Sequence, residues 1–133
     1  MKELTLREVY GEEGPPGFAR LLGMLKVYAE GDVFAVSMTA GKEHTNGNGT
    51  VHGGVLYALA DQAAGASVTY KGRRGIGMDG VIRYYRPAYE GDTLTAYCTE
   101  RKSGRRIRVC SVEVKNADGV LLADASFTGI YAD

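Results

Sequence analysis

A stretch of 27 residues, His44–Tyr70, carries a single formal charge, which is on Asp61. Its second part, Gly53–Thr69, is rich in alanine and includes Leu56 and Leu59, which predicts a helix about 25 Å long. Small side chains let a neighbouring backbone approach closely. Such a helix therefore fits a fold in which it lies along a sheet that curls around it.

Extended segments surround this helix. Two strands with a Gly31-Asp32 turn precede it, and four strands separated by turn residues follow it. Hairpin connections favour an antiparallel sheet, so we expect an α+β fold in one domain spanning residues 1–133. The predicted ranges are a helix face at Phe18, Leu21, Leu22 and Leu25, two strands within Lys26–Ala40, and strands at about 78–86, 92–101, 106–115 and 120–131.

The chain is neutral overall, with 16 basic and 16 acidic residues, but the charges are unevenly distributed. Residues 71–108 hold ten bases and four acids, a net charge of +6, which leaves −6 for the rest of the chain. A local positive field in a neutral chain favours a small polyanionic ligand over a long nucleic acid. The alternative is an ordinary strand face whose charges point into solvent.

Composition excludes several other classes of protein. The hydrophobic content of 44% is too high for a disordered chain. No apolar run is long enough to span a membrane, and Met1–Val9 does not have the pattern of a signal peptide. Cys98 and Cys110 favour a reducing, cytoplasmic compartment, and we expect packed thiols rather than a disulfide. The chain's two histidines and two cysteines have no zinc-ligand spacing, so no metal site is expected.

The candidate site begins at Asp61, which sits in mid-helix with no partner for a salt bridge one turn away. Just upstream, His52-Gly53-Gly54 would place a free Gly53 amide at the start of the helix, where the helix dipole favours an oxyanion. His52 could add a hydrogen bond, and Asn46 could orient a water molecule. Together these groups suit acyl transfer. Taken singly, a solvent-facing aspartate, a loop histidine and turn asparagines are the competing interpretations.

The spacing between these groups has a consequence for assembly. Gly53 and Asp61 are eight residues apart, or about 12 Å along one helix. A catalytic base has to come within about 3 Å of its target. We therefore expect Gly53 of one chain to work with Asp61 of a partner, in a two-fold dimer with two equivalent sites.

The motif residues continue downstream with Arg86-Pro87-Ala88, Gly91-Asp92 and Ser103-Gly104-Arg105. With Asn46, His52-Gly53-Gly54 and Asp61, this pattern resembles the PaaI-like hotdog-fold acyl-CoA thioesterases over nearly the whole chain. The resemblance implies a curled antiparallel sheet around one long helix. It also implies active sites at a dimer interface, within a homotetramer.

The resemblance further implies a role for each site residue. Asp61 would act as general base or as nucleophile, and the Gly53 amide would polarise the thioester carbonyl. His52 would lie beside that carbonyl, and Asn46 near the attacking water. Some relatives place a hydroxyl side chain on the strand after the helix, where this chain has Gly75-Ile76-Gly77-Met78. The residues expected to contact the substrate and its CoA phosphates are Gly54, Arg86, Arg105 and Arg106.

The predicted function is hydrolysis of a small aryl- or acyl-CoA to free acid and CoA, with no cofactor beyond the CoA of the substrate. A non-catalytic acyl-CoA sensor and a hotdog enoyl-CoA hydratase are the alternatives. Residues 75–80 spell G-x-G-x-x-G, but a helix precedes them and a strand follows, the reverse of a dinucleotide site. Tyr84, Tyr85 and Tyr89 could line a pocket, although at strand spacing they are more often core or interface residues.

Overall fold

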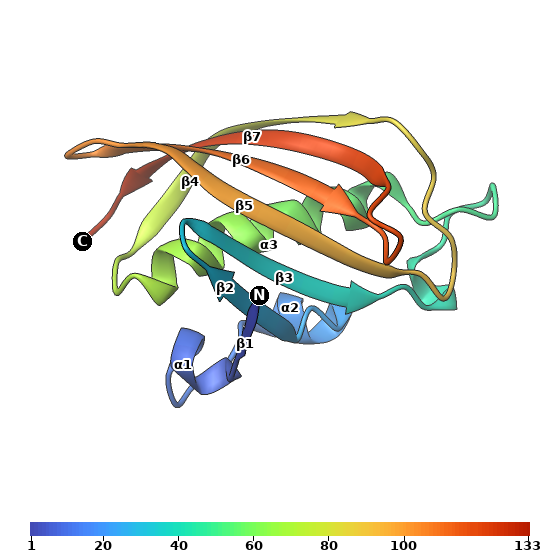
Figure 1. Cartoon of the computed structure of the whole chain (residues 1–133), viewed down its shortest axis with the longest axis horizontal. Coiled ribbons are helices and arrows are strands. Elements are labelled where there is room, and N and C mark those ends of the chain that lie inside the picture. Colours follow the sequence, from blue (N-terminus) through green and yellow to red (C-terminus); the bar gives the residue numbers. More distant parts are fainter.

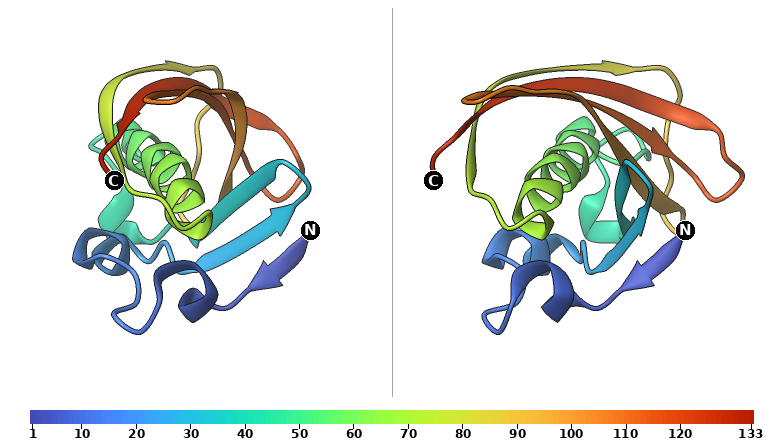
Figure 2. Two further views of the ribbon diagram at one scale, coloured as in Figure 1. Left: turned by 90° about the vertical axis from the view of Figure 1, so that its left-hand side faces the viewer. Right: turned by 60° about the vertical axis from the view of Figure 1, so that its left-hand side comes forward.

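A computed structural model describes all residues, 1–133. One long helix, α3 (Gly53–Tyr70), lies against a seven-stranded sheet that curls around it, as Figures 1 and 2 show. The strands are β1 (Lys2–Leu4), β2 (Lys26–Glu30), β3 (Val33–Thr39), β4 (Gly75–Tyr84), β5 (Thr93–Ser103), β6 (Ile107–Lys115) and β7 (Leu121–Tyr131). The shorter helices are α1 (Leu6–Tyr10), α2 (Gly17–Leu22) and the 3₁₀ turn η1 (Lys42–His44).

The sheet has the order β1-β2-β3-β5-β6-β7-β4, and every neighbouring pair is antiparallel. The strand that follows α3, β4, pairs with β7 and so forms one edge of the sheet. The sheet is not closed. This is the predicted α+β hotdog arrangement, and the fold prediction is confirmed.

The core forms where α3 meets the concave face of the sheet. Leu59, Ala60 and Ala63 of α3 are completely buried, as are Leu94 of β5 and Val112 of β6. The alanines let the strands approach the helix backbone, which explains why this helix is so rich in small residues. Each fully buried leucine or valine stabilises the fold by about 1.5–3 kcal/mol relative to an exposed one.

The helix predicted near the N-terminus is present, but most of its apolar face does not meet the core. The helix there, α2, is only six residues long. The side chains of Phe18 and Leu21 are 59% and 76% exposed, whereas Ala19 and Met24 are completely buried. Apolar spacing alone does not say which side of a short helix meets the core, because the chain turns sharply at Gly23 in the left-handed conformation. The strand β1 and the helix α1 were not predicted.

The other boundaries lie within a few residues of those predicted. The largest difference is β4, which begins at Gly75 rather than 78 and includes the whole G-x-G-x-x-G segment. That segment is a regular edge strand with one register shift between Gly77 and Asp79, not a phosphate-binding loop. Cys98 and Cys110 are free and buried, as expected.

Candidate active site

The start of α3 is held by His52. Its Nδ1 accepts a hydrogen bond from the Gly54 N–H at 2.8 Å, and its carbonyl accepts the Val55 N–H at 2.9 Å. Because Nδ1 is an acceptor, the neutral ring carries its proton on Nε2. His52 thus caps the helix and leaves an exposed N–H that can be donated to a ligand.

The Gly53 amide is the free donor at this helix start. It makes no hydrogen bond in the structure, while the groups on either side of it are fixed. The His52 N–H is donated to the His44 carbonyl at 2.8 Å, and the Tyr84 hydroxyl is donated to the Gly53 carbonyl at 2.9 Å. A rigidly held amide at a helix N-terminus can bind a developing oxyanion.

The Asn46 side chain is largely used by its own loop. Its Oδ1 accepts the N–H groups of Asn48 at 2.7 Å and Thr50 at 3.3 Å, and its amide is donated to the Thr50 hydroxyl at 2.9 Å. The turn chemistry considered as the alternative for Asn46 is therefore present. One amide hydrogen of Asn46 remains for a ligand or a water molecule.

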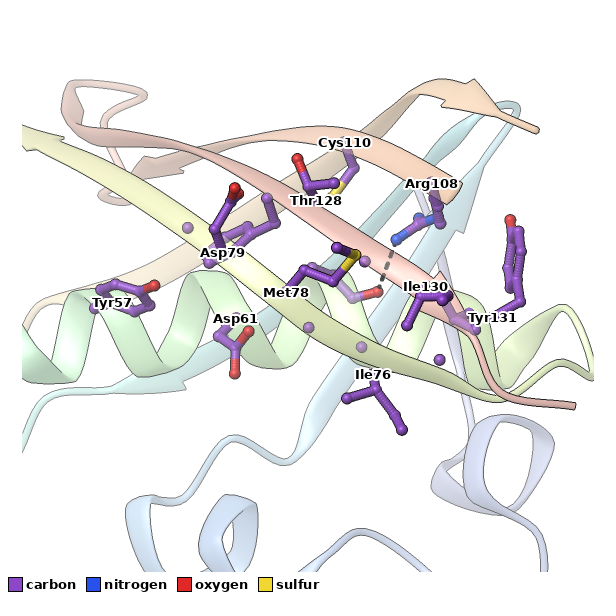
Figure 3. Close-up of a pocket in the computed structure, with 18 residues that line it drawn as sticks. Tyr57, Asp61, Ile76, Met78, Asp79, Arg108, Cys110, Thr128, Ile130 and Tyr131 are labelled. Atoms are coloured by element: carbon purple, nitrogen blue, oxygen red, sulfur yellow. Dashed lines mark hydrogen bonds between the residues drawn. The ribbon is translucent and has the colours of Figure 1, made fainter. Parts of the chain in front are cut away.

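Asp61 lies in the middle of α3 and lines a cavity of about 460 Å³ between α3 and β4 (Figure 3), and in the single chain it is also exposed to solvent. The carboxylate has no hydrogen bond and no ion pair in the structure. Burial raises the pKa of Asp61 above its usual 3.8. A carboxylate that lacks protein partners and faces a cavity is free to take a proton from a bound molecule.

The chain does not bring Gly53 and Asp61 together. Gly53 lines a second cavity of about 310 Å³, together with Tyr84 and Arg86, whereas Asp61 lines the first. This arrangement agrees with the separation expected from the rise of the helix.

The three predicted CoA-binding arginines also lie at two places. Arg86 lines the Gly53 cavity, and its N–H pairs with Leu122 at the beginning of β7. Arg105 and Arg106 are exposed in the β5–β6 turn, where the Arg106 carbonyl pairs with Tyr131 at the end of β7. The length of β7 between these pairs is about 30 Å.

Arg108 is excluded from the basic surface because it is buried. Its Nε donates to Glu100 at 2.7 Å, and Nη1 and Nη2 donate to the Ala64 carbonyl and the Ser67 hydroxyl. Lys71 and Arg73 are paired with Glu100 and Asp133. The positive charge available to a ligand is therefore smaller than the net charge of +6 over residues 71–108 suggests.

The roles of two tyrosines near the site were not predicted from the sequence. Tyr84 fixes the Gly53 peptide, although the sequence suggested only a pocket or core role. Tyr57 lines the Asp61 cavity and was missed, although its position four residues before Asp61 places both on one helix face. Tyr85 lines the Gly53 cavity, and Tyr89 is exposed outside both cavities.

No group of three His, Cys, Asp or Glu side chains is close enough to hold a metal ion. Asp79, the second carboxylate at the Asp61 cavity, points away from α3 in Figure 3. None of the helices is both long and apolar enough to cross a membrane.

A curled antiparallel sheet around one long central helix defines a hotdog protein. Comparison with known proteins identifies the family. Residues 48–123 match the model of the Thioesterase superfamily, and the chain belongs to that superfamily.

Named relatives are consistent with this assignment. The PaaI acyl-coenzyme A thioesterase of Escherichia coli is 32% identical over 98 residues, which cover 74% of this chain and 70% of that protein. Human acyl-coenzyme A thioesterase 13 is 33% identical over 116 residues, covering 84% and 82%. With relatives named acyl-CoA thioesterases and esterases, the protein is classed as a thioester hydrolase.

Solved structures show the same fold. The E. coli PaaI protein superposes with a TM-score of 0.86 over 98% of this chain and 97% of that one, at 24% identity. A hypothetical thioesterase from Streptococcus pneumoniae, solved with coenzyme A, has a TM-score of 0.75 and 26% identity, and the match covers 80% and 86%.

Proposed function

We propose that this protein hydrolyses a small aryl- or acyl-CoA to free acid and CoA, with Asp61 as base or nucleophile and the Gly53 amide as oxyanion donor. The observation that carries the proposal is the free Gly53 N–H at a helix start where the neighbouring groups are hydrogen-bonded. A donor fixed in advance stabilises the negative charge that develops on a thioester oxygen during attack.

The chemistry at the carbonyl follows from the free donors and acceptors. The Gly53 N–H and the His52 Nε2–H are donated to the carbonyl oxygen. Asp61 either takes a proton from water, whose oxygen bonds to the carbonyl carbon, or attacks that carbon itself to form an anhydride that water then opens. On the base route, the carbon–sulfur bond then breaks and the proton held by Asp61 goes to the CoA thiolate. On the nucleophile route, the carbon–sulfur bond breaks as the anhydride forms, the CoA thiolate takes its proton from water, and hydrolysis of the anhydride restores the Asp61 carboxylate. The remaining amide hydrogen of Asn46 contacts the water.

We propose that each site is formed by two chains. The distance along α3 supports this, because Gly53 and Asp61 of one chain cannot reach the same carbonyl. The free edge of β4 is a suitable contact, since Ile76, Met78 and Val81 are 61%, 59% and 55% exposed. Antiparallel pairing of two β4 edges would bring the Gly75 end of one chain to the Tyr84 end of the other. A homotetramer of such dimers is part of the proposal.

The same pairing would join the separated arginines. Arg86 of one chain would face the β5–β6 turn of its partner, so that Arg86, Arg105 and Arg106 contact the phosphates of one CoA. Gly54 contributes by its lack of a side chain, because a Cβ atom there would lie 3.0 Å from His52 Nδ1. The proposal requires no cofactor. A cytoplasmic location is supported by the two free cysteines.

The test measures release of free thiol from a panel of aryl- and acyl-CoA thioesters, with Asp61→Asn as the control variant. We expect release from at least one thioester and a loss of at least about 100-fold in kcat for the variant. Calorimetric binding of acyl-CoA without release would favour a sensor. Hydration of crotonyl-CoA without release would favour a hydratase.

A further inference from the structure

The geometry of the Asp61 cavity points to Tyr57 as a further catalytic residue, whose hydroxyl holds the attacking water together with Asp61. This inference rests on the proposed function and adds to it a second contact to the water. The hydroxyl oxygen accepts one hydrogen of the water while Asp61 takes the other, and the water's free electron pair then faces the carbonyl carbon.

Tyr57 and Asp61 share the same cavity and the same side of α3. They are four residues apart, so their side chains lie on consecutive turns, about 6 Å apart along the helix axis. In Figure 3 the Tyr57 hydroxyl lies on the side of the ring nearer to Asp61. The inference places the attacking water in this cavity, between the two side chains.

The ring of Tyr57 is held in place. It packs edge-on against Phe127, with ring centroids 5.6 Å apart and an angle of 71° between the planes. At Gly80 of β4, a Cβ atom would overlap both the Tyr57 hydroxyl and the Phe127 ring. Glycine at this position makes room for the hydroxyl, so the strand is fitted to a tyrosine at position 57.

The Tyr57 hydroxyl is the one available hydroxyl in the cavity. It has no hydrogen-bond partner in the protein. Thr128, which also lines the cavity, projects away from α3 in Figure 3, and the Tyr131 hydroxyl is bonded to Ser103. Asn46, the other predicted contact to the water, has one free amide hydrogen and no free acceptor pointing away from its loop. Asn46 therefore cannot accept a hydrogen from the water, and the Tyr57 hydroxyl is a group in the cavity that can.

The test is kinetic and uses Tyr57→Phe, with Tyr97→Phe on β5 as the matched control. Loss of one hydrogen bond to the water predicts a fall in kcat of about 10- to 100-fold, with KM changed less than about threefold. The fall should be similar for every acyl-CoA that the wild-type protein hydrolyses, because the water is common to all of them. Tyr97→Phe should keep wild-type kcat.

Three results would overturn the inference. They are a kcat within twofold of wild type, a change confined to KM, or a loss seen only with bulky acyl groups, which would mean that the ring merely contacts the acyl chain. If Asp61→Asn is inactive while Tyr57→Phe is normal, this inference fails and the proposed function stands. If the wild-type protein releases no CoA from any thioester, the proposed function itself fails.

Discussion

His52 combines two roles that substitutions can separate. Its Nδ1 caps α3 by accepting the Gly54 N–H at 2.8 Å, and its Nε2–H is free for the substrate. His52→Ala removes both. Loss of a helix cap costs about 1 kcal/mol, which lowers the melting temperature of a domain of this size by about 3–5 °C. His52→Asn places an amide oxygen where Nδ1 lies, so it keeps the cap and loses only the Nε2–H.

We therefore expect His52→Asn to melt within about 1 °C of wild type and His52→Ala to melt lower. Both variants should lose about 10- to 100-fold in kcat, because one donor to the oxyanion is missing. Melting is followed by circular dichroism, and turnover by release of free thiol. Wild-type turnover in His52→Asn would refute donation by Nε2, and a wild-type melting temperature in His52→Ala would refute the cap.

Three further outcomes follow from the structure. Burial raises the pKa of Asp61, so its ionised carboxylate destabilises the folded chain at neutral pH, and Asp61→Asn should have a higher melting temperature there. This gain should disappear as the pH falls through the raised pKa toward 3.8. A lower melting temperature of Asp61→Asn at neutral pH would contradict this. Replacing Arg86, Arg105 and Arg106 by alanine should raise KM for acyl-CoA with little change in kcat, and the increase in KM should be smaller in high salt. An unchanged KM would show that these arginines do not bind CoA. Gly80→Ala should lower the free energy of unfolding, measured in urea, by about 1–3 kcal/mol, because the added Cβ atom overlaps Tyr57 and Phe127. A wild-type free energy of unfolding would contradict this and show that the packing relaxes easily.

The sequence predicted the features that depend on local spacing. The long helix, the strand breaks and the free amide after His52 all follow from residue type and helix geometry, and the structure places each of them as expected. The separation of Gly53 from Asp61 needs only the rise per residue of a helix. Local spacing is visible directly in the sequence, which is why these features could be predicted.

The features that the sequence did not reveal depend on packing between distant segments. The face of α2 that meets the core depends on how the chain leaves Gly23, so the apolar spacing of Phe18 and Leu21 was misleading. The role of Tyr57 depends on which residues of β4 lie over α3. The sum of charges over 71–108 did not show that Arg108 is buried and paired with Glu100.

Mixing of subunits tests directly whether each active site joins the Gly53 end of one chain to Asp61 of another. Asp61→Asn and His52→Ala are each expected to have low activity alone. When the two variants are unfolded and refolded together, half of the dimers should be mixed, and one of their two sites would have both wild-type halves. We expect recovery to about one quarter of wild-type activity per chain. Activity that stays at the average of the two separate variants would contradict it.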